Sequence, residues 1–286
     1  MGESTSRMSG AASVARLAAG GLVWSVLGSG VALAQPAGPN AGALTFTGGL
    51  DVPSVFVFRG IVQEVDPRLT VQPAAEVAVA LGKGLTAGLG VRHSVHTGSA
   101  GSEGPTGRSH YREDVFASVG APVRGGLRVT MTYAAFTSPN FLFDTVHDLS
   151  FTIVRAGRYA PYALVAFELA GAADQLDHGT GRYLELGVGP TYRLRSATTL
   201  RIPLKVGLSL SHYYEQFTGD SAFGFLSVGG LVVHPLGGRG AFGSWDVRGG
   251  AEVYTFGDGT KGFNANRSGD VPSARIVARV GIGVSY

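Results

Sequence analysis

Apolar residues alternate with polar or small ones along most of this chain, with a period of two. In Leu200–His212, leucine, isoleucine and valine occupy every second position, and Arg201, Lys205 and small residues lie between them. The same design returns in Trp245–Tyr254 and Ala274–Tyr286. Because successive side chains of a β-strand point to opposite faces, this period predicts strands and not helices.

Most of the alternating segments exceed the length of about five to six residues that is typical of strands in soluble proteins. They reach the length of about nine to eleven residues with which a tilted strand crosses a bilayer. Short turns alternate with longer polar loops, as in outer-membrane barrels. We therefore predict an all-β fold, a transmembrane up-and-down antiparallel β-barrel of about 12 strands. The predicted strands are residues 44–62, 69–81, 85–97, 110–121, 127–136, 145–155, 160–170, 181–193, 198–214, 222–234, 244–256 and 273–286.

A soluble β-barrel would show the same alternation with its apolar face turned inward. Glycines such as Gly207, Gly281 and Gly283 lie among the charges on the polar face. A solvent-exposed face gains nothing from glycine, whereas a crowded interior gains room for large neighbours. Aromatic residues near the strand ends are typical of the two interfacial girdles, so both features favour a membrane barrel. The aromatic residues are Tyr192, Trp245 and Tyr286 toward the turns and Phe136, Tyr213, Tyr214 and Phe256 toward the loops.

The N-terminal stretch has the layout of a secretory signal peptide. Arg7 and Arg16 form a positive leader, and the apolar run Leu17–Ala34 ends in a small-x-small triplet. An N-terminal membrane anchor is the alternative, but the glycines and serines within the run disfavour it. We expect export through the periplasm to the bacterial outer membrane. The predicted divisions are a signal peptide at 1–34, a short N-terminal segment at 35–42 and the barrel at 43–286.

Composition changes this picture in three ways. Glycine accounts for 45 of 286 residues, far above the usual share of about 7%, and it follows no collagen period. There is no cysteine, which excludes disulfides and thiolate metal sites. The 23 basic and 20 acidic residues nearly balance at a net charge of +3, so we expect no nucleic-acid partner.

By alternation, fifteen charged side chains point into the barrel, eight of them basic and seven acidic. Because an unpaired buried charge is costly, one interpretation is a structural network of ion pairs. The other is a pore lining whose charges steer charged solutes, and both can hold at different depths. The predicted lumen residues are Arg59, Glu76, Arg92, Asp114, Arg128, Asp148, Glu168, Glu185, Arg201, Lys205, Asp246, Arg248, Glu252, Arg275 and Arg279.

The histidines do not predict an enzyme. A nucleophile and its base must share a face, yet His93 and Ser94 are sequence neighbours and point to opposite faces. Ser94 and His96 do share a face, but it is the lumenal one. The acids and histidines are scattered and form no metal-binding motif. We therefore expect no enzymatic activity, no cofactor and no metal.

The stretch "SVFVFRGIVQ" (Ser54–Gln63) resembles the first strand of the TorF-type porin family, whose pattern runs Tyr-x-Phe-Arg-Gly-x-Ser-Gln. The following Pro67–Val79 looks like that family's second strand. The resemblance implies an outer-membrane barrel of channel function with no defined substrate, and it carries over no catalytic residue. The matching positions are Phe58, Arg59, Gly60 and Gln63, and the departures are Phe56 for tyrosine and Val62 for serine.

Within this motif Arg59 is the residue of interest. By alternation it points inward, opposite to Phe56 and Phe58, and we expect it to pair with a lumenal acid such as Glu76. A structural role of this kind is favoured over ligand binding.

These observations together predict a channel for passive diffusion of small hydrophilic solutes. The alternative is a non-conducting structural or binding barrel that acts through its extracellular loops. The expected partners of the protein are outer-membrane lipid and lipopolysaccharide, small hydrophilic solutes and the barrel assembly machinery. The last strand fits the pattern that this machinery recognises, through Gly281, Val284 and Tyr286, and we expect it to close the barrel against residues 44–62.

Overall fold

The computed structural model describes nine stretches of the chain, and the expected signal peptide and the segment 35–42 lie outside them. Among the described residues, no helix combines the length and apolar character needed to cross a membrane. The described stretches are residues 43–63, 69–97, 109–141, 143–171, 181–194, 197–215, 219–237, 243–265 and 269–286.

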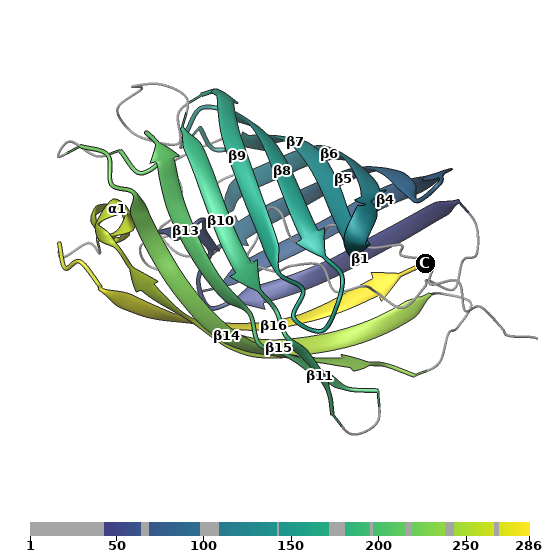
Figure 1. Cartoon of the computed structure of the whole chain (residues 1–286). Helices are drawn as coiled ribbons and strands as arrows, with labels where there is room; N and C mark the ends of the chain where they lie inside the picture. The colour runs from purple at the N-terminus through teal and green to yellow at the C-terminus, as the bar shows by residue number, and fades with distance from the viewer. Residues whose placement is uncertain are drawn as a thin grey trace, which may run out of the picture.

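The described chain forms a closed, up-and-down antiparallel β-barrel (Figure 1). The sheet holds fourteen hydrogen-bonded strands. Two pairs of them, β10 with β11 and β12 with β13, are consecutive pieces of one wall strand each, so the wall has twelve strands, as the alternation predicts. The wall consists of β1 (Leu44–Pro53), β4 (Thr70–Gly82), β5 (Leu85–His96), β6 (His110–Val123), β7 (Leu127–Thr137), β8 (Val146–Arg155), β9 (Tyr162–Ala170), β10 (Arg182–Val188), β11 (Thr191–Arg193), β12 (Thr199–Arg201), β13 (Leu204–Ser211), β14 (Phe223–Pro235), β15 (Ser244–Phe256) and β16 (Ala274–Ser285).

Prolines divide the two interrupted wall strands. Pro190 separates β10 from β11, and Pro203 separates β12 from β13. Proline has no backbone N–H to give to a ladder, so the regular pairing stops there. The Ile202 amide still donates to the Pro190 carbonyl at 3.0 Å, which keeps the wall continuous.

The barrel closes between its first and last strands, which lie side by side in Figure 1. Gly48 pairs with Val284, and Pro53 pairs with Arg279. The backbones of Phe46 and Tyr286 exchange two hydrogen bonds of 2.8 Å. Closure leaves neither strand with an unpaired edge.

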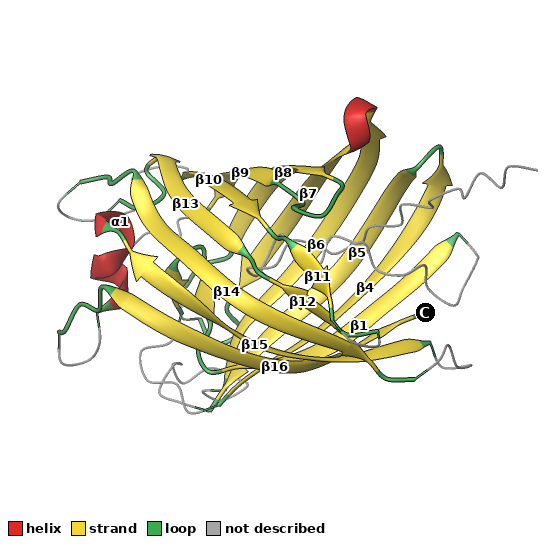
Figure 2. Cartoon of the chain, turned by 60° about the horizontal axis from the view of Figure 1, so that its bottom comes forward, coloured by secondary structure: helices red, strands yellow, loops and turns green. Residues whose placement is uncertain are grey.

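Short helical turns mark the two ends of the barrel (Figure 2). At the end with the short turns, η1 (Arg124–Gly126) joins β6 to β7. At the opposite end, with the longer loops, α1 (Asp258–Lys261) and η2 (Gly262–Asn264) lie between β15 and β16. We call these the turn end and the loop end.

The wall is apolar on its outer face and polar on its inner face, the reverse of a soluble protein. Large apolar side chains such as Leu89 and Ile276 are 62% and 67% exposed on the outside. Asp148 and Lys205 point inward and are almost completely buried. Soluble proteins almost never bury such charges in place of their apolar residues, so this surface suits lipid outside and polar contacts inside.

The predicted first strand is wrong beyond Pro53. Residues 54–63 leave the wall and form a small hairpin of β2 (Val57–Phe58) and β3 (Ile61–Val62). Arg59 and Gly60 make its two-residue turn, with φ of 48° and 80°. Positive φ at both central positions is the type I′ geometry that two-residue hairpins favour.

This hairpin lies inside the barrel, because its side chains contact wall strands on opposite sides of the lumen. Val57 packs in a buried cluster with Leu164 of β9 and Val277 of β16. Phe58 packs in another buried cluster, against Phe136 of β7. We call residues 54–63 the inner hairpin.

The predicted aromatic girdle on the loop side is wrong as well. Phe136, Tyr213, Tyr214 and Phe256 are at most 3% exposed and face the interior. They pack in the buried clusters that enclose the inner hairpin. Contact with the apolar hairpin residues buries their apolar surface inside the barrel and not against lipid. At the turn end, Trp245 and Tyr286 are exposed, while Tyr192 is half-buried, with the Arg158 guanidinium 4.6 Å above its ring.

Candidate functional site: the lumen and its inner hairpin

The turn of the inner hairpin is held by a two-point ion pair with the wall. Arg59 Nη1 and Nη2 donate to the two carboxylate oxygens of Asp148 on β8, at 2.9 and 3.1 Å. The same Nη1 lies 3.2 Å from the Tyr213 hydroxyl. Burial opposes the charge of Arg59, but Asp148 and Tyr213 outweigh it and hold the pKa of the guanidinium above its usual value. Arg59 therefore stays charged although it is buried.

This pairing differs from the expected one between Arg59 and Glu76. The prediction assumed that Arg59 belongs to a wall strand next to β4. In the structure the chain folds inward before Arg59, so its side chain reaches β8 on another part of the wall. Glu76 is also buried and inward-facing, beside Gly88 and Ser118, without a contact to Arg59.

Phe56 and Phe58 lie on the interior side too, against the prediction that they face away from Arg59. Phe58 stacks edge-on to Phe136, with ring centroids 5.3 Å apart, and the Arg59 guanidinium lies 5.0 Å from the Phe58 ring. Phe56 packs edge-on to His96 at 6.2 Å. In a wall strand, alternation separates a lipid-side face from an interior face. The inner hairpin lies within the lumen, so both of its faces contact the interior of the barrel.

The loop between β15 and β16 clamps the inner hairpin from the other side. The Asn264 side chain accepts a hydrogen bond from the Val62 amide at 2.7 Å and donates one to the Gly60 carbonyl at 2.9 Å. The Tyr214 hydroxyl donates to the Arg59 carbonyl at 2.8 Å. The backbone of the turn is therefore fixed by side chains of two different loops.

A small cavity adjoins this clamp. It has a volume of about 220 Å³ and lies between the inner hairpin, the β15–β16 loop and the start of β16. Val62, Asn264, Asp270 and Arg275 are among its lining residues, so one acid and one base face it. Arg275 thus lies at the loop end of the interior.

Arg112 and Asp114 form a second group beneath the hairpin. The Arg112 guanidinium lies 4.0 Å from the Phe58 ring centroid and 4.2 Å from that of Phe136, and its Nε donates to Asp114. Arg92 Nε lies 3.3 Å from the other Asp114 oxygen. Arg112 was not among the predicted lumen residues, although it lies two positions from Asp114 and alternation therefore gives it the same inward parity, that is, the same face of the strand.

Further ion pairs line the wall below the hairpin. Lys205 Nζ lies 2.6 Å from Glu252, which also accepts a hydrogen bond from Ser227. Arg248 donates to both oxygens of Asp51 at 2.8 and 3.1 Å. Asp51 was not among the predicted lumen residues, although alternation along residues 44–62 places it on the same inward face as Arg59.

The remaining predicted lumen residues also occupy the interior side of the wall. Glu185 accepts hydrogen bonds of 2.6 Å from the hydroxyls of Tyr162 and Tyr183. Arg128 donates to the Gly84 carbonyl at the turn end. The others are Glu168, which accepts from the Gly181 amide; Arg201, packed beside Gly189; Asp246, beside Gly283; and Arg279, half-buried on β16.

The three residues of the predicted assembly signal lie on or next to β16. Gly281 faces inward beside Asp51 and Arg248, and Val284 pairs with Gly48 and Trp245. Tyr286 is about half exposed at the turn end. Their role in assembly stays a prediction.

Ser94 and His96 meet inside the barrel, as their shared parity predicts. Ser94 Oγ lies 2.7 Å from His96 Nε2, and Gln72 donates to the same Oγ at 3.3 Å. The His96 ring stacks on Tyr111 at 4.6 Å. Ser94 and His96 are 2% and 0% exposed, so the pair belongs to the packing around the inner hairpin.

Comparisons with known proteins find barrels of similar architecture. No protein-family model matches the chain, and no curated protein matches it. The translocator domain of the autotransporter NalP from Neisseria meningitidis aligns at 12% identity and a TM-score of 0.44, covering 86% of this chain and 89% of that one. The NanC porin aligns at 10% identity and a TM-score of 0.43, covering 85% and 99%. OmpF of Salmonella typhi aligns at 11% identity and 0.38, covering 85% and 97%.

These scores lie below 0.5, so the architecture of this chain stands on its own strand pairing. The resemblance to the TorF-type porins also stays a prediction. Its motif has a clear place in the structure: Arg59 and Gly60 form the turn of the inner hairpin, and Gln63 ends it. The Gln63 side chain accepts a hydrogen bond from the Tyr111 hydroxyl at 3.3 Å.

Proposed function

We propose that this protein is an outer-membrane channel for passive diffusion of small hydrophilic solutes, narrowed at its loop end by the inner hairpin. The observation that carries the proposal is the inner hairpin itself, held across a charged lumen by Asp148 on one side and Asn264 on the other. The outward apolar surface fits a bacterial outer membrane, with lipid and lipopolysaccharide around the wall.

In this proposal transport needs no energy input. The polar lumen replaces the hydrocarbon barrier, and charges such as Arg128 and Asp246 toward the turn end bias which solutes pass. The inner hairpin restricts the cross-section, so only small solutes pass while it is in place. A barrel of twelve strands is intermediate between filled eight-stranded barrels and water-filled porins of about sixteen strands.

Planar-bilayer recording of the refolded protein tests the proposal. The wild type should show small, uniform conductance steps in salt. A variant in which a Gly-Ser linker of equal length replaces residues 54–63 should show steps several-fold larger, since the wall remains while the constriction is gone. If neither protein conducts, although both show the heat-modifiable migration of folded barrels, the channel proposal is wrong.

The close packing of the inner hairpin favours a second candidate, a non-conducting structural or binding barrel that acts through its loops. Phe56 and Phe58 are 4% and 7% exposed, which leaves little open space around them. A silent wild type with a conducting linker variant would support this candidate. So would a loop deletion that abolishes binding to a partner without changing permeability.

We further propose that the barrel has no enzymatic activity. The Ser94–His96 pair has the spacing of a nucleophile and its base, but both side chains are buried beneath the inner hairpin. Lipid-hydrolysis assays on the purified barrel test this. Hydrolysis that disappears in Ser94→Ala would overturn it.

A further inference from the structure

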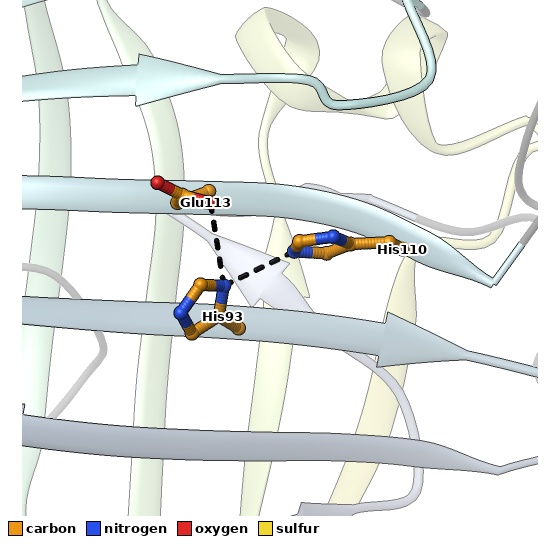
Figure 3. A group of neighbouring side chains, drawn as sticks. All are labelled: His93, His110 and Glu113. Carbon is orange, nitrogen blue, oxygen red and sulfur yellow. Dashed lines mark hydrogen bonds and ion pairs between the residues drawn. The ribbon is translucent and has the colours of Figure 1, made fainter. Parts of the chain in front are cut away.

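Two histidines and a glutamate converge on the outer face of β5 and β6, and we propose that they form a binding site for a zinc-like divalent transition-metal ion. His93 Nδ1 lies 3.1 Å from His110 Nε2 and 3.6 Å from Glu113 Oε2 (Figure 3). The three potential ligand atoms all lie within 4.8 Å of one another. The site is separate from the lumen and independent of the channel function.

The distances suit tetrahedral coordination. With metal–ligand bonds of about 2.0–2.1 Å, two ligand atoms on one tetrahedral ion lie about 3.3–3.4 Å apart. The contacts of His93 to His110 and to Glu113 bracket this value. The Glu113 and His110 ligand atoms lie within 4.8 Å of each other, so all three groups can approach one ion.

A β-bulge places the second histidine in this group. The pairing shifts between Ser94, which faces Arg112, and Val95, which faces His110. In regular pairing His110 would lie opposite His96 and point into the lumen. The extra residue, Tyr111, turns inward and stacks on His96, and His110 is thereby turned outward beside His93. Bulges commonly re-aim side chains at functional sites.

The third ligand follows from simple cross-strand pairing. Glu113 lies directly opposite His93 in the β5–β6 ladder, so both side chains emerge on the same face. Imidazole binds metals through its neutral form, so the two histidines would hold the ion as neutral ligands beside the Glu113 carboxylate.

The ligand set indicates the class of metal. Two imidazoles and one carboxylate suit Zn²⁺ and related first-row ions, whereas Ca²⁺ and Mg²⁺ prefer shells of oxygen ligands. The other histidines of the described chain have different neighbours. His96 contacts Ser94, His147 contacts Tyr133, His234 contacts Thr198, and His212 contacts Glu215.

The site is open at the outer surface of the protein. The His93 and Glu113 side chains are 33% and 36% exposed. The exposed apolar residues Leu89 and Val115 occupy the same outer faces on the turn side of the site. The group therefore lies nearer to the loop end of the wall than these two apolar residues.

Zinc titration of the tag-free, refolded barrel against a chelating indicator tests the proposal. The wild type should bind one Zn²⁺ saturably at this site. His93→Ala, His110→Ala and Glu113→Gln should each weaken that binding by at least about tenfold, since even the loss of an outer-shell partner costs about 10–100-fold. The matched control is His147→Ala, which removes an outward histidine from a neighbouring strand pair and should leave the binding unchanged.

The fold of each variant is checked by heat-modifiable migration, and X-ray absorption of the zinc-loaded barrel gives a second readout. Two imidazole ligands with zinc–nitrogen distances of about 2.0–2.1 Å would support the site. Absence of saturable binding in the wild type would overturn the proposal. Equal weakening by His147→Ala and His93→Ala would overturn it as well.

Discussion

The guanidinium of Arg59 and the carboxylate of Asp148 form a buried two-point ion pair, although 89 positions separate the two residues in the chain. The pair joins the turn of the inner hairpin to the wall of the barrel. Both side chains are almost inaccessible, at 4% and 0% exposure, so neither charge has water as an alternative partner. Together with the Asn264 hydrogen bonds, this contact holds the hairpin in the lumen.

Asp148→Asn should destabilise the folded barrel by about 3–5 kcal/mol, because it leaves the Arg59 charge buried and uncompensated. Denaturant unfolding in detergent measures this loss. The matched control is Asp258→Asn, which breaks an exposed pair with Lys261 and should cost only about 0–1 kcal/mol. The double variant Arg59→Leu with Asp148→Leu should recover part of the stability, because it removes both buried charges. Equal effects of the two single variants would contradict the prediction.

Asn264→Ala should loosen the inner hairpin while the wall stays intact. It removes the acceptor of the Val62 amide and the donor to the Gly60 carbonyl, at a cost of about 1–3 kcal/mol for groups left unsatisfied. Hydrogen exchange should show lost protection at Val62 and unchanged protection in the wall strands. Asn264→Asp keeps the acceptor and should retain more protection at Val62. Unaltered exchange in Asn264→Ala would show that the clamp is not needed.

Gly281→Ala should destabilise the barrel, whereas Gly249→Ala should not. A Cβ at Gly281 would collide with the Asp51 carboxylate that pairs with Arg248, and overpacking of this kind costs about 1–3 kcal/mol. A Cβ at Gly249, on the neighbouring strand, would meet no atom closer than 3.9 Å. Unfolding free energies of the two variants give the comparison. The same loss in both would mean that interior crowding is not the reason for glycine at 281.

Tyr286→Asp should lower the yield of assembled barrel roughly several-fold, since it replaces an aromatic side chain at the turn-end interface with a charge. Tyr286 pairs through its backbone with Phe46 where the barrel closes. Heat-modifiable migration in membrane fractions measures assembly. Tyr159→Asp, at another exposed tyrosine near the turn end, is the control and should assemble normally. Normal assembly of the Tyr286 variant would count against the predicted assembly signal.

The sequence predicts the wall of this barrel well, because each wall strand has one lipid-side and one interior face. Lys205 on β13 and Glu252 on β15 both carry inward parity, and they meet as an ion pair. The same parity brings Ser94 to His96. Parity cannot identify partners, however, since it gives the face of a residue and not its neighbours across the lumen. Arg59 with Asp148 is the clearest case.

The inner hairpin left one signal in the sequence. Val55, Phe56, Val57 and Phe58 are four consecutive apolar residues, which do not alternate and so do not fit a wall strand with a polar face. All four are buried in the structure. The bulge at Tyr111 left no such signal, because an inserted residue shifts the parity without changing the composition.

The sequence by itself determined the strands, their number and the sorting of charges to the inside, because period-two alternation is a local property of extended chain. Only the tertiary structure decided which residues meet: Arg59 with Asp148 across the lumen, and His93 with His110 across a bulge. The physical reason is that closing a barrel brings distant strands together. The inward turn after Pro53 brings Arg59 to Asp148, and the extra residue in β6 turns His110 outward beside His93.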